Sequence, residues 1–503
     1  MASQDAVRPN VLFVLTDDQG PWAMGCAGNE EIRTPVLDAL AAAGTRLENF
    51  FCASPVCSPA RATLLTGQVP SAHGVHDYLR APHVGAEAVD YLAGQLLVTD
   101  VLADHGYRLG LAGKWHLGAN ERPRRGFVHW YAHEAGGSAY HDAPMYRSGR
   151  REAAEGYLTD LLADDAVRFV DDRCDPSEQG RPFFFSLNFT APHSPWKGQH
   201  PEEIEQLYAD CAFRTCPQTA PHPWTTLAHG SPLGGEPDTR AALVGYFSAV
   251  TAMDRALGRV VDRLERHGLL ESTLVVFTSD NGFNAGHHGI WGKGNGTWPL
   301  NMYDSSVKVP AIIAQPGRIA AGVVRRELLS AYDLPATLLE LVGVDPGPME
   351  AGPGRSFAPL LLGGCAAGES EHGLGRADER SDERVVVHDE YGPTRMIRTR
   401  EWKYVHRWPD GPHELYDLTR DPQEEVNLAG QADGPIATVR ERLHQELGEW
   451  FARWARPEHD GQRLPVIGTG QAAAASDPMA FQGPLWDARA GESRTTRRPE
   501  QGR

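Results

Sequence analysis

The sequence predicts an α/β protein with two parts: a large domain in which helices flank a mainly parallel central sheet, and a smaller C-terminal α+β domain with an antiparallel sheet. Short, continuously apolar segments at residues 11–15 and 273–277 are typical of strands that are buried on both faces of a sheet. Residues 241–270 have the period of a long amphipathic helix that leads into the second of these strands. Four short alternating segments after residue 383 predict the antiparallel sheet.

Changes in composition mark the domain boundaries. We place the large domain at residues 8–362, because residues 363–382 are dominated by Gly, Glu, Ser and Arg and are typical of an exposed connection. The smaller domain follows at residues 383–456. The tail, residues 457–503, has no apolar period, and we expect it to be partly disordered.

The composition is that of an ordinary globular protein, with 41% hydrophobic and 23% charged residues in a chain of 503. The 48 basic and 66 acidic residues give a formal net charge of −18, so we expect neither nucleic acid nor an acidic membrane as a partner. No apolar segment precedes the first strand, which predicts a cytoplasmic location. The seven scattered cysteines lack C-x-x-C spacing and are predicted to be mostly reduced thiols.

Two of the predicted strands end in similar polar residues. The first runs into Asp17 and Asp18, and the strand at residues 273–277 runs into Asp280 and Asn281. Each acidic pair by itself is also compatible with a turn or a helix cap. Together, at one edge of a parallel sheet, three carboxylates need a cation to lie close to one another, and oxygen ligands in this number suit Ca²⁺ better than Mg²⁺.

A short helix is predicted directly after Cys57. Ser58 is a suitable cap, Pro59 suits the first helical position and Gly67 ends the helix. This places the sulfur of Cys57 where backbone N–H groups favour an anion, with Arg61 one turn further along. A lone cysteine is equally often a small buried apolar residue.

The strand predicted at residues 107–112 leads into an exit loop that contains Lys114 and His116. In an extended segment these two side chains project to the same side. The strand predicted at residues 181–189 is followed by His193, which lies between two prolines that restrict its backbone. A surface lysine and packed histidines are the structural alternatives.

Three later segments complete the large domain. Residues 198–239 lack a clear period and are predicted to form a long excursion over the ligand edge of the sheet, where Trp196 and the loop at residues 286–298 would add pocket walls. The Gly-rich residues 286–294 carry Lys293 and two histidines of weaker expectation, His287 and His288. A strand at residues 309–313 and a helix at residues 331–342 follow.

In the smaller domain, the alternating segments lie at residues 384–388, 395–400, 402–407 and 413–418. We expect Asp433 to cap a following helix. One stripe of that helix would cover the sheet with the apolar residues Leu443, Leu447, Trp450, Phe451 and Trp454.

Taken in order, these motifs resemble the type I sulfatases, formylglycine-dependent members of the alkaline-phosphatase-like superfamily. Residues 57–61 match the family signature C-x-P-x-R, and residues 113–118 match its G-K-W-H-x-G element. The resemblance extends over residues 8 to 455 and implies the two-part fold described above.

The resemblance also implies roles for single residues. In the family, the cysteine that corresponds to Cys57 is oxidised to formylglycine (3-oxoalanine) by a maturation enzyme acting in trans, and its hydrated aldehyde is the nucleophile. Arg61 would orient this group, His116 would act as the base that regenerates the aldehyde, and His193 would protonate the leaving oxygen. The implied substrate-binding residues are Lys114 and Lys293. The implied ligands of the divalent cation are Asp17, Asp18, modified Cys57, Asp280 and Asn281.

The resulting prediction is an arylsulfatase-like sulfuric ester hydrolase that acts on sulfate monoesters, with a sulfated carbohydrate or another small organic sulfate as substrate. A phosphonate monoester or phosphodiester hydrolase of the same superfamily is the main alternative, because tetrahedral anions differ mainly in charge. A non-catalytic binder of sulfated ligands, in which Cys57 stays unmodified, is a second one.

Overall fold

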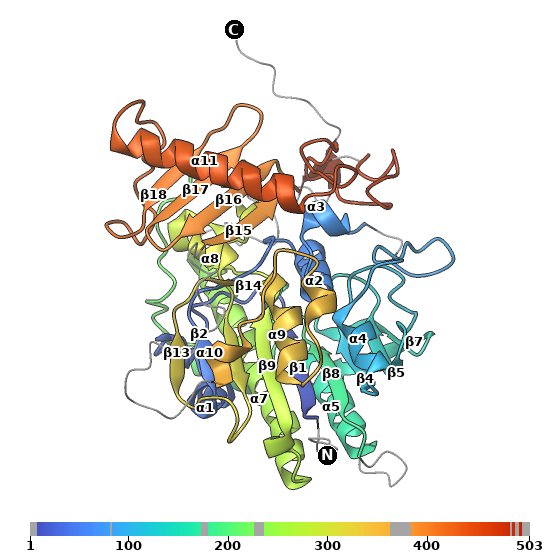
Figure 1. The fold of residues 1–503 in the computed structure, drawn as a ribbon. Coiled ribbons are helices and arrows are strands. Elements are labelled where there is room, and N and C mark those ends of the chain that lie inside the picture. The colour runs from blue at the N-terminus through green and yellow to red at the C-terminus, as the bar shows by residue number, and fades with distance from the viewer. Residues whose placement is uncertain are drawn as a thin grey trace, which may run out of the picture.

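The structure is a computed structural model that describes residues 8–80, 83–172, 180–225, 236–362 and 384–482, together with the short strands β19 (Leu485–Asp487) and β20 (Glu492–Arg494). Its main feature is a ten-stranded sheet at the centre of the large domain (Figure 1). Across this sheet the strands follow in the order β13 (Val323–Arg325), β2 (Thr45–Leu47), β12 (Ala311–Ala314), β9 (Thr273–Ser279), β1 (Asn10–Thr16), β8 (Phe183–Asn188), β4 (Arg108–Gly113), β5 (Phe127–His133), β6 (His141–Arg147) and β7 (Arg150–Tyr157).

The middle of the sheet is parallel. β9, β1, β8, β4 and β5 all run in one direction, whereas β12 is antiparallel to both of its neighbours and β6 and β7 form an antiparallel extension. In the pairing of β1 with β9, Thr16 lies opposite Ser279, so the two strands end at the same level. The prediction of a mainly parallel sheet is confirmed.

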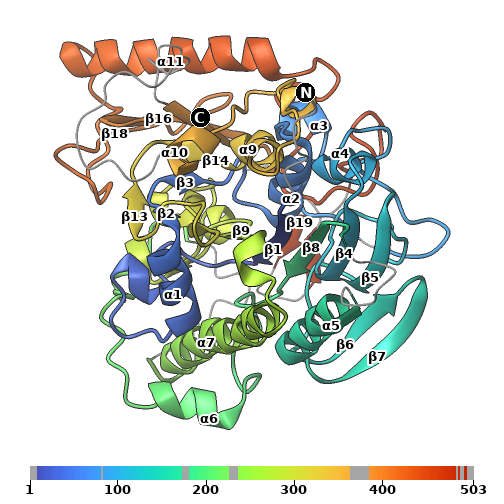
Figure 2. The ribbon, with the colours of Figure 1, turned by 60° about the horizontal axis from the view of Figure 1, so that its bottom comes forward.

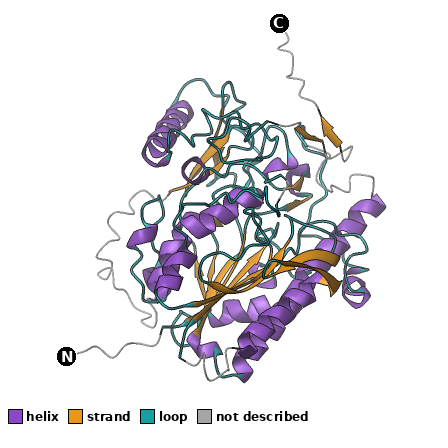
Figure 3. Cartoon of the chain, turned by 90° about the vertical axis from the view of Figure 1, so that its right-hand side faces the viewer, coloured by secondary structure: helices purple, strands orange, loops and turns teal. Residues whose placement is uncertain are grey.

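Helices cover both faces of this sheet (Figures 2 and 3). Leu12 and Val14 pack on one face with α1 (Pro35–Ala43), α5 (Leu158–Asp172) and α7 (Glu236–Arg266). Val11, Phe13 and Leu15 pack on the other face with α2 (Cys57–Thr66), α4 (Val98–Asp104) and α9 (Leu334–Leu341). Because successive side chains enter opposite cores, the strand reads as one continuous apolar run.

The second sheet is antiparallel, as predicted, and one helix covers it. Its strands are β15 (Arg384–Asp389), β16 (Thr394–Thr399), β17 (Trp402–Arg407) and β18 (Glu414–Asp417). The covering helix is α11 (Pro435–Trp454), which buries Leu443, Leu447, Trp450 and Phe451. The prediction that Asp433 caps it is wrong, since Gly434 is the cap residue and Pro435 begins the helix.

Helix ends differ elsewhere from the predictions. α2 begins at Cys57 itself, so Ser58 lies inside the helix and makes no capping hydrogen bond, whereas Gly67 ends it with φ +65° as expected. α7 begins at Glu236, before the predicted start, and ends at Arg266. No helix in the described ranges combines the length and apolarity needed to cross a membrane.

Shorter elements connect these layers. They are β3 (Phe50–Phe51), β14 (Leu329–Ser330), β10 (Asn284–Ala285), β11 (Trp291–Gly292), α3 (Pro70–His73), α6 (Glu202–Glu205), α8 (Asp304–Val307) and α10 (Ala358–Leu362). The predicted connection at residues 363–382, and residues 226–235 of the predicted excursion, lie outside the described residues.

Part of the tail packs on the large domain. Residues 457–482, which belong to the tail for which we expected partial disorder, run back to the segment after α3. Gln471 is fully buried, donates its N–H to Tyr78 O at 2.8 Å and accepts from Arg80 N at 3.0 Å. Gly470 N donates to Asp77 Oδ2 at 2.8 Å. The division of the chain at residues 362, 383 and 456 stays a proposal.

Candidate active site

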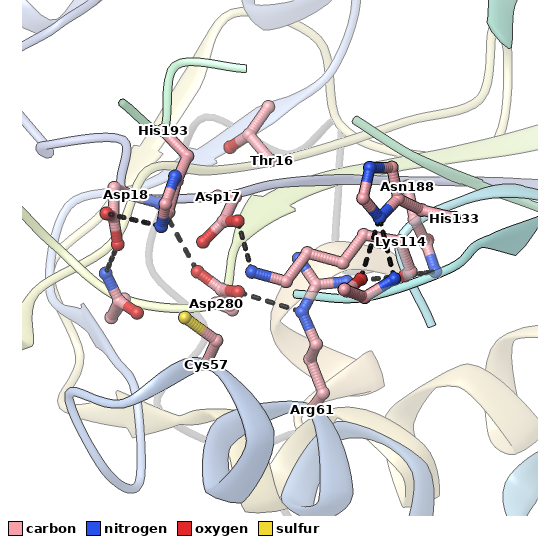
Figure 4. Close-up of polar contacts among 12 residues, drawn as sticks. Thr16, Asp17, Asp18, Cys57, Arg61, Lys114, His133, Asn188, His193 and Asp280 are labelled. Carbon is pink, nitrogen blue, oxygen red and sulfur yellow. Dashed lines mark hydrogen bonds and ion pairs between the residues drawn. The ribbon is translucent and has the colours of Figure 1, made fainter. Parts of the chain in front are cut away.

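The carboxyl ends of β1 and β9 bring the two predicted acidic pairs together (Figure 4). Asn281 Nδ2 donates to Asp18 Oδ1 at 2.7 Å, and Asp18 N donates to Asp280 Oδ1 at 3.4 Å. Asp17 completes the group, and all four residues are buried. The polar residues that follow two strands far apart in sequence therefore form one buried cluster.

Cys57 faces this cluster from the first turn of α2. Its sulfur and one oxygen each from Asp17 and Asp18 lie within 4.8 Å of one another. The residue is only 7% exposed. The sulfur of Cys57 thus lies next to the carboxylates of Asp17 and Asp18, as the sequence predicted.

Three basic side chains pair with the three carboxylates. Lys293 Nζ lies 2.6 Å from Asp18 Oδ1 and also donates to Cys57 Sγ at 2.9 Å. Lys114 Nζ is ion-paired with Asp17 Oδ2. Arg61 Nε lies 2.9 Å from Asp280 Oδ2, and its Nη1 donates to the backbone oxygen of Lys114 at 2.8 Å. Each of the three predicted carboxylates therefore has one predicted basic side chain as its partner.

The carboxylates differ in how well they hold their charge. Burial opposes ionisation of Asp17 and Asp18, yet Lys114 lowers the pKa of Asp17 and Lys293 lowers the pKa of Asp18. Burial and the negative charge of Asp17 raise the pKa of Asp280 to about 6, although Arg61 opposes them. Asp280 is therefore the carboxylate whose ionised form would be stabilised most by additional positive charge.

Burial and Asp17 also raise the pKa of the Cys57 thiol to about 11. An unmodified Cys57 is therefore a protonated thiol at neutral pH, and a protonated thiol is a poor nucleophile.

The residues present fit a divalent cation. Asp17 Oδ1 is buried and has no hydrogen-bond partner among the described residues. The ammonium group of Lys293 already contacts Asp18 Oδ1 and, at 3.2 Å, Asn281 Oδ1. Positive charge is thus stabilised at the point where the oxygens converge, and carboxylate and amide oxygens are the ligands that hard cations such as Ca²⁺ prefer.

His193 presents one ring nitrogen to the cluster. Its Nδ1 lies 2.7 Å from Ser194 O, which assigns the proton to Nδ1 in the neutral ring. Tyr140 OH donates to His193 O at 2.8 Å and holds the segment in place. The other ring nitrogen, Nε2, lies 3.8 Å from Asp18 Oδ2. His193 can therefore exchange a proton at Nε2 beside the acidic cluster.

His116 is buried close to the cationic side of the site. Burial, Lys114 and His83 lower its pKa well below the usual value, so its ring is neutral at neutral pH. Its Nδ1 has no hydrogen-bond partner in the described part of the chain. A Cβ atom on Gly136 would lie 2.4 Å from His116 Nε2, so only glycine leaves room for the ring.

Three residues that position the site were missed in the sequence. Asn188, at the end of β8, donates to Lys114 O at 2.9 Å. Tyr246 OH donates to Asp18 O at 2.8 Å and accepts from Gly20 N, which supports Asp18 at its φ of +62°. The strand-end position of Asn188 was a usable signal, whereas Tyr246 and Gly136 lie in segments that showed none.

Two expected pocket walls do not line the site. Trp196 is 4% exposed, packs against Tyr246 and Phe283 and donates Nε1 to Pro192 O, so the prediction that it shapes the pocket is wrong. His287 Nε2 is hydrogen-bonded to Thr215 O and its ring packs against Trp22.

His288 stacks on Tyr303 with 3.8 Å between the ring centroids. In the same loop, Trp298 is 45% exposed.

Comparison with known proteins is consistent with this arrangement. Residues 9–344 match the sequence model described as Sulfatase. The chain belongs to the sulfatase family. Residues 286–452 in addition match the model described as N-sulphoglucosamine sulphohydrolase, C-terminal. The protein is therefore a sulfuric ester hydrolase of the alkaline-phosphatase-like superfamily.

Relatives of this sulfatase act on different esters, to judge by their names. An N-acetylglucosamine-6-O-sulfatase of Bacteroides thetaiotaomicron is 26% identical over 89% of this chain and 87% of its own length. Human arylsulfatase A is 29% identical over 87% of this chain and 86% of its own length. A solved structure of a protein bound to its substrate D-glucosamine-2-N,6-O-disulfate matches the fold with a TM-score of 0.73 at 24% identity, and the match covers 89% of this chain and 98% of the other.

Proposed function

We propose that this sulfatase hydrolyses sulfate monoesters of saccharides, with a formylglycine derived from Cys57 and a divalent cation, Ca²⁺, in its active site. The observation that carries the proposal is the convergence of Cys57 with two acidic strand ends, each carboxylate being matched by its own cationic side chain. Burial raises the pKa of the Cys57 thiol, so the thiol itself would be a poor nucleophile, which supports a converted residue in that role.

Asp17, Asp18, Asp280 and Asn281 would hold the cation, together with an oxygen on the modified residue 57. A cation there supplies charge stabilisation to an oxyanion, and hydrated formylglycine supplies an oxygen nucleophile. These two groups account for the convergence of oxygen atoms at this edge of the sheet.

The side chains of the chain itself then have separate tasks. Lys293 and Lys114 would hold the sulfuryl oxygens, and Arg61 would orient residue 57 while its hydrogen bond to the backbone oxygen of Lys114 holds that lysine in position. The imidazolium form of His193, which carries a proton on Nε2 as well as on Nδ1, would donate the Nε2 proton to the departing alcohol oxygen. His116, neutral at neutral pH, would accept the proton of a hydroxyl group of hydrated residue 57 when the aldehyde is regenerated.

A saccharide is the favoured alcohol because the loop that carries Lys293 also carries an exposed aromatic side chain. The loop that carries this lysine continues to Trp298, whose indole is 45% exposed and is held by a hydrogen bond from Trp298 N to Trp224 O at 2.8 Å. A sugar ring can stack on such a face. An aryl ring can do the same, so the substrate class must be tested directly.

The decisive experiment has two steps. Mass spectrometry of the peptide that contains residue 57, from protein made together with a maturation enzyme, should show formylglycine, and Cys57→Ala is the control that cannot be converted. Fully active protein with only the thiol would contradict the proposal. Protein that keeps the Cys57 thiol in the presence of the maturation enzyme and hydrolyses no ester would favour the non-catalytic binder.

The second step compares kcat/KM for an aryl sulfate, sulfated mono- and disaccharides, choline sulfate, a phosphonate monoester and a phosphodiester. We expect a sulfated saccharide to be the best substrate. If a phosphorus ester is hydrolysed faster than every sulfate, the alternative hydrolase is correct; if only the aryl sulfate is hydrolysed, the saccharide assignment alone is wrong.

A further inference from the structure

A second hollow with unusual charge lies away from the acidic cluster. It is a cavity of about 460 Å³ at the outer edge of the large sheet, where β13 and the residues that follow it meet the end of β16. In Figures 1 and 2, β13 is the edge strand on the side of the C-terminal sheet. The cavity is thus built from both parts of the chain.

The lining of this cavity is strongly basic. Four arginines and one carboxylate, Glu327, line it, so it carries an excess of three positive charges in a protein whose net charge is −18. The arginines are Arg325, Arg326, Arg398 and Arg400. A positive cluster that opposes the charge of the whole chain concentrates anions locally.

Acidic partners neutralise this cluster only in part. Arg326 Nε lies 2.7 Å from Glu48 Oε2, although the Arg326 side chain is 78% exposed. Arg398 Nη2 lies 3.4 Å from Asp304 Oδ2, and Lys403 Nζ lies 2.6 Å from the other oxygen of that carboxylate, so Arg398 shares this partner. Arg398 Nε is buried without a hydrogen-bond partner among the described residues. Glu327 is no closer than 4.0 Å to Arg325. A buried guanidinium with an unpaired N–H is stabilised by an anion that accepts from it.

A further cation lies directly behind this lining. Lys308 Nζ donates to Asn49 Oδ1 at 2.9 Å, and Asn49 is itself a residue of the cavity wall. Burial lowers the pKa of Lys308, and Arg398 lowers it further, while Asp304 opposes both. Positive charges in this region therefore repel one another, which an anion in the cavity would relieve.

We propose that this cavity is a second anion site, which binds a sulfate group or another tetrahedral oxyanion. The planar forks of arginine match tetrahedral oxyanions through paired hydrogen bonds. Two sources supply this chemistry: a free oxyanion such as the sulfate released by the reaction, or a second sulfate group on the saccharide whose first sulfate lies at Cys57. The second source rests on the proposed function.

The cavity and the candidate active site lie at the same end of the sheet, where β13 and β9 have their carboxyl ends. β2 and β9 are both antiparallel to β12, and β13 is parallel to β2, so β13 and β9 run in the same direction. The register aligns Val323 with Thr45, Ile313 and Val276, so Arg325 is level with Thr278, two residues before Asp280. Three strand spacings correspond to roughly 14 Å, a distance that an oligosaccharide spans.

Calorimetric titration of the full chain tests the site. Cys57→Ala prevents hydrolysis, and the probes are inorganic sulfate, inorganic phosphate, and a disaccharide and a hexasaccharide of the heparin type. The exposed arginines are removed in the Arg326→Gln/Arg400→Gln variant, and Glu327→Gln removes the single negative charge of the lining. Arg259→Gln is the matched control, because Arg259 is a half-exposed arginine of α7 that is paired with Asp160 and Asp164.

We expect the double variant to bind at least about tenfold more weakly, since it loses hydrogen bonds from charged donors to the anion. Glu327→Gln should bind several-fold more tightly, and Arg259→Gln should bind like the parent protein. A purely structural role of these arginines would not produce tighter binding in Glu327→Gln. This variant therefore keeps the test decisive even if the double variant folds poorly.

The probes separate the two sources. If the hexasaccharide binds more tightly than the disaccharide and the double variant loses this difference, the site holds a second sulfate group of a chain. If inorganic sulfate and phosphate occupy a second site that the double variant lacks, while chain length has no effect, the site holds a free oxyanion. If the double variant and Glu327→Gln both bind every probe like the parent, the inference is wrong. Turnover of a monosulfated ester by the wild-type protein tests the proposed function independently.

Discussion

Replacing Lys293 by methionine would separate two effects of one ammonium group. In the structure, Nζ lies 2.6 Å from Asp18 Oδ1 and 3.2 Å from Asn281 Oδ1, and both Lys293 and Asp18 have side chains that are only 8% exposed. Methionine keeps most of the length of the side chain and removes its charge. Asp18 then loses its closest cation, while the oxygens that would hold a divalent ion remain.

The expected magnitudes follow from burial. Breaking a buried ion pair by removing one partner costs about 3–5 kcal/mol, so the cation-free variant should be less stable by about this amount. Bound Ca²⁺ would restore the missing charge. If the variant destabilises the cation-free state by about 3 kcal/mol and leaves the Ca²⁺-bound state unchanged, its affinity for Ca²⁺ should be roughly a hundredfold higher than that of wild type. Because a charged donor to the sulfuryl group is lost, kcat/KM should fall on the order of a hundredfold at saturating Ca²⁺.

The assay is thermal unfolding in chelator and in excess Ca²⁺, combined with calorimetric titration of Ca²⁺ into cation-free protein. Lys197→Met is the matched control: Lys197 Nζ lies 2.7 Å from Asp238 Oδ1, but the two side chains are 45% and 53% exposed, and such a pair contributes at most about 1 kcal/mol. The reasoning is refuted if Lys293→Met binds Ca²⁺ no more tightly than wild type, or if its cation-free form loses no more stability than Lys197→Met.

Three further predictions concern other parts of the structure. Gly136→Ala should lower kcat by at least about tenfold, because the new Cβ would lie 2.4 Å from His116 Nε2. The control is Gly448→Ala in α11, where nothing lies within 4 Å of the new Cβ; this variant should keep its activity, and its free energy of unfolding should rise by up to about 1 kcal/mol. Equal activity of the two variants would contradict the steric argument. Burial lowers the pKa of His200 to about 3, so the unfolded chain takes up a proton first as the pH falls below about 6.5. His200 should therefore lower the free energy of unfolding by about 2 kcal/mol between pH 7 and pH 5. The urea midpoint of His200→Gln should fall less over that interval than the midpoint of wild type. Trp298→Ala should raise KM for a sulfated disaccharide several-fold more than for a small alkyl sulfate, and an equal change for both would argue against stacking.

Much of the fold was predictable because its signals are local. β1 and β9 are buried on both faces, and such strands are continuously apolar in any sequence. Their polar ends are equally local, so Asp17, Asp18, Asp280 and Asn281 could be assigned to one edge of the sheet before any contact was known. The stripe on α11 was predictable for the same reason, since helical period alone defines it.

Side chains whose direction depends on packing were predicted less well. Trp196 follows His193 by three residues and looked like a pocket wall, but its ring fills the core between α7 and the loop after β9, where a large apolar ring is stabilised more than at a wet surface. Ser58 and Asp433 are good caps in isolation, yet the chain enters each helix at a neighbouring residue. Gly136 gave no signal, because its importance lies in the ring of His116 that packs against it.

The sequence by itself determined the class of the fold and the identities of the candidate site residues, because strand periodicity and short motifs do not depend on distant contacts. Only the tertiary structure decided how the charges are matched: Lys293 with Asp18, Lys114 with Asp17 and Arg61 with Asp280. It also decided that arginines from two domains share a cavity at the sheet edge. Each of these contacts joins residues tens to hundreds of positions apart, and strand register and domain packing, which no local pattern encodes, bring their charges within a few ångströms of one another.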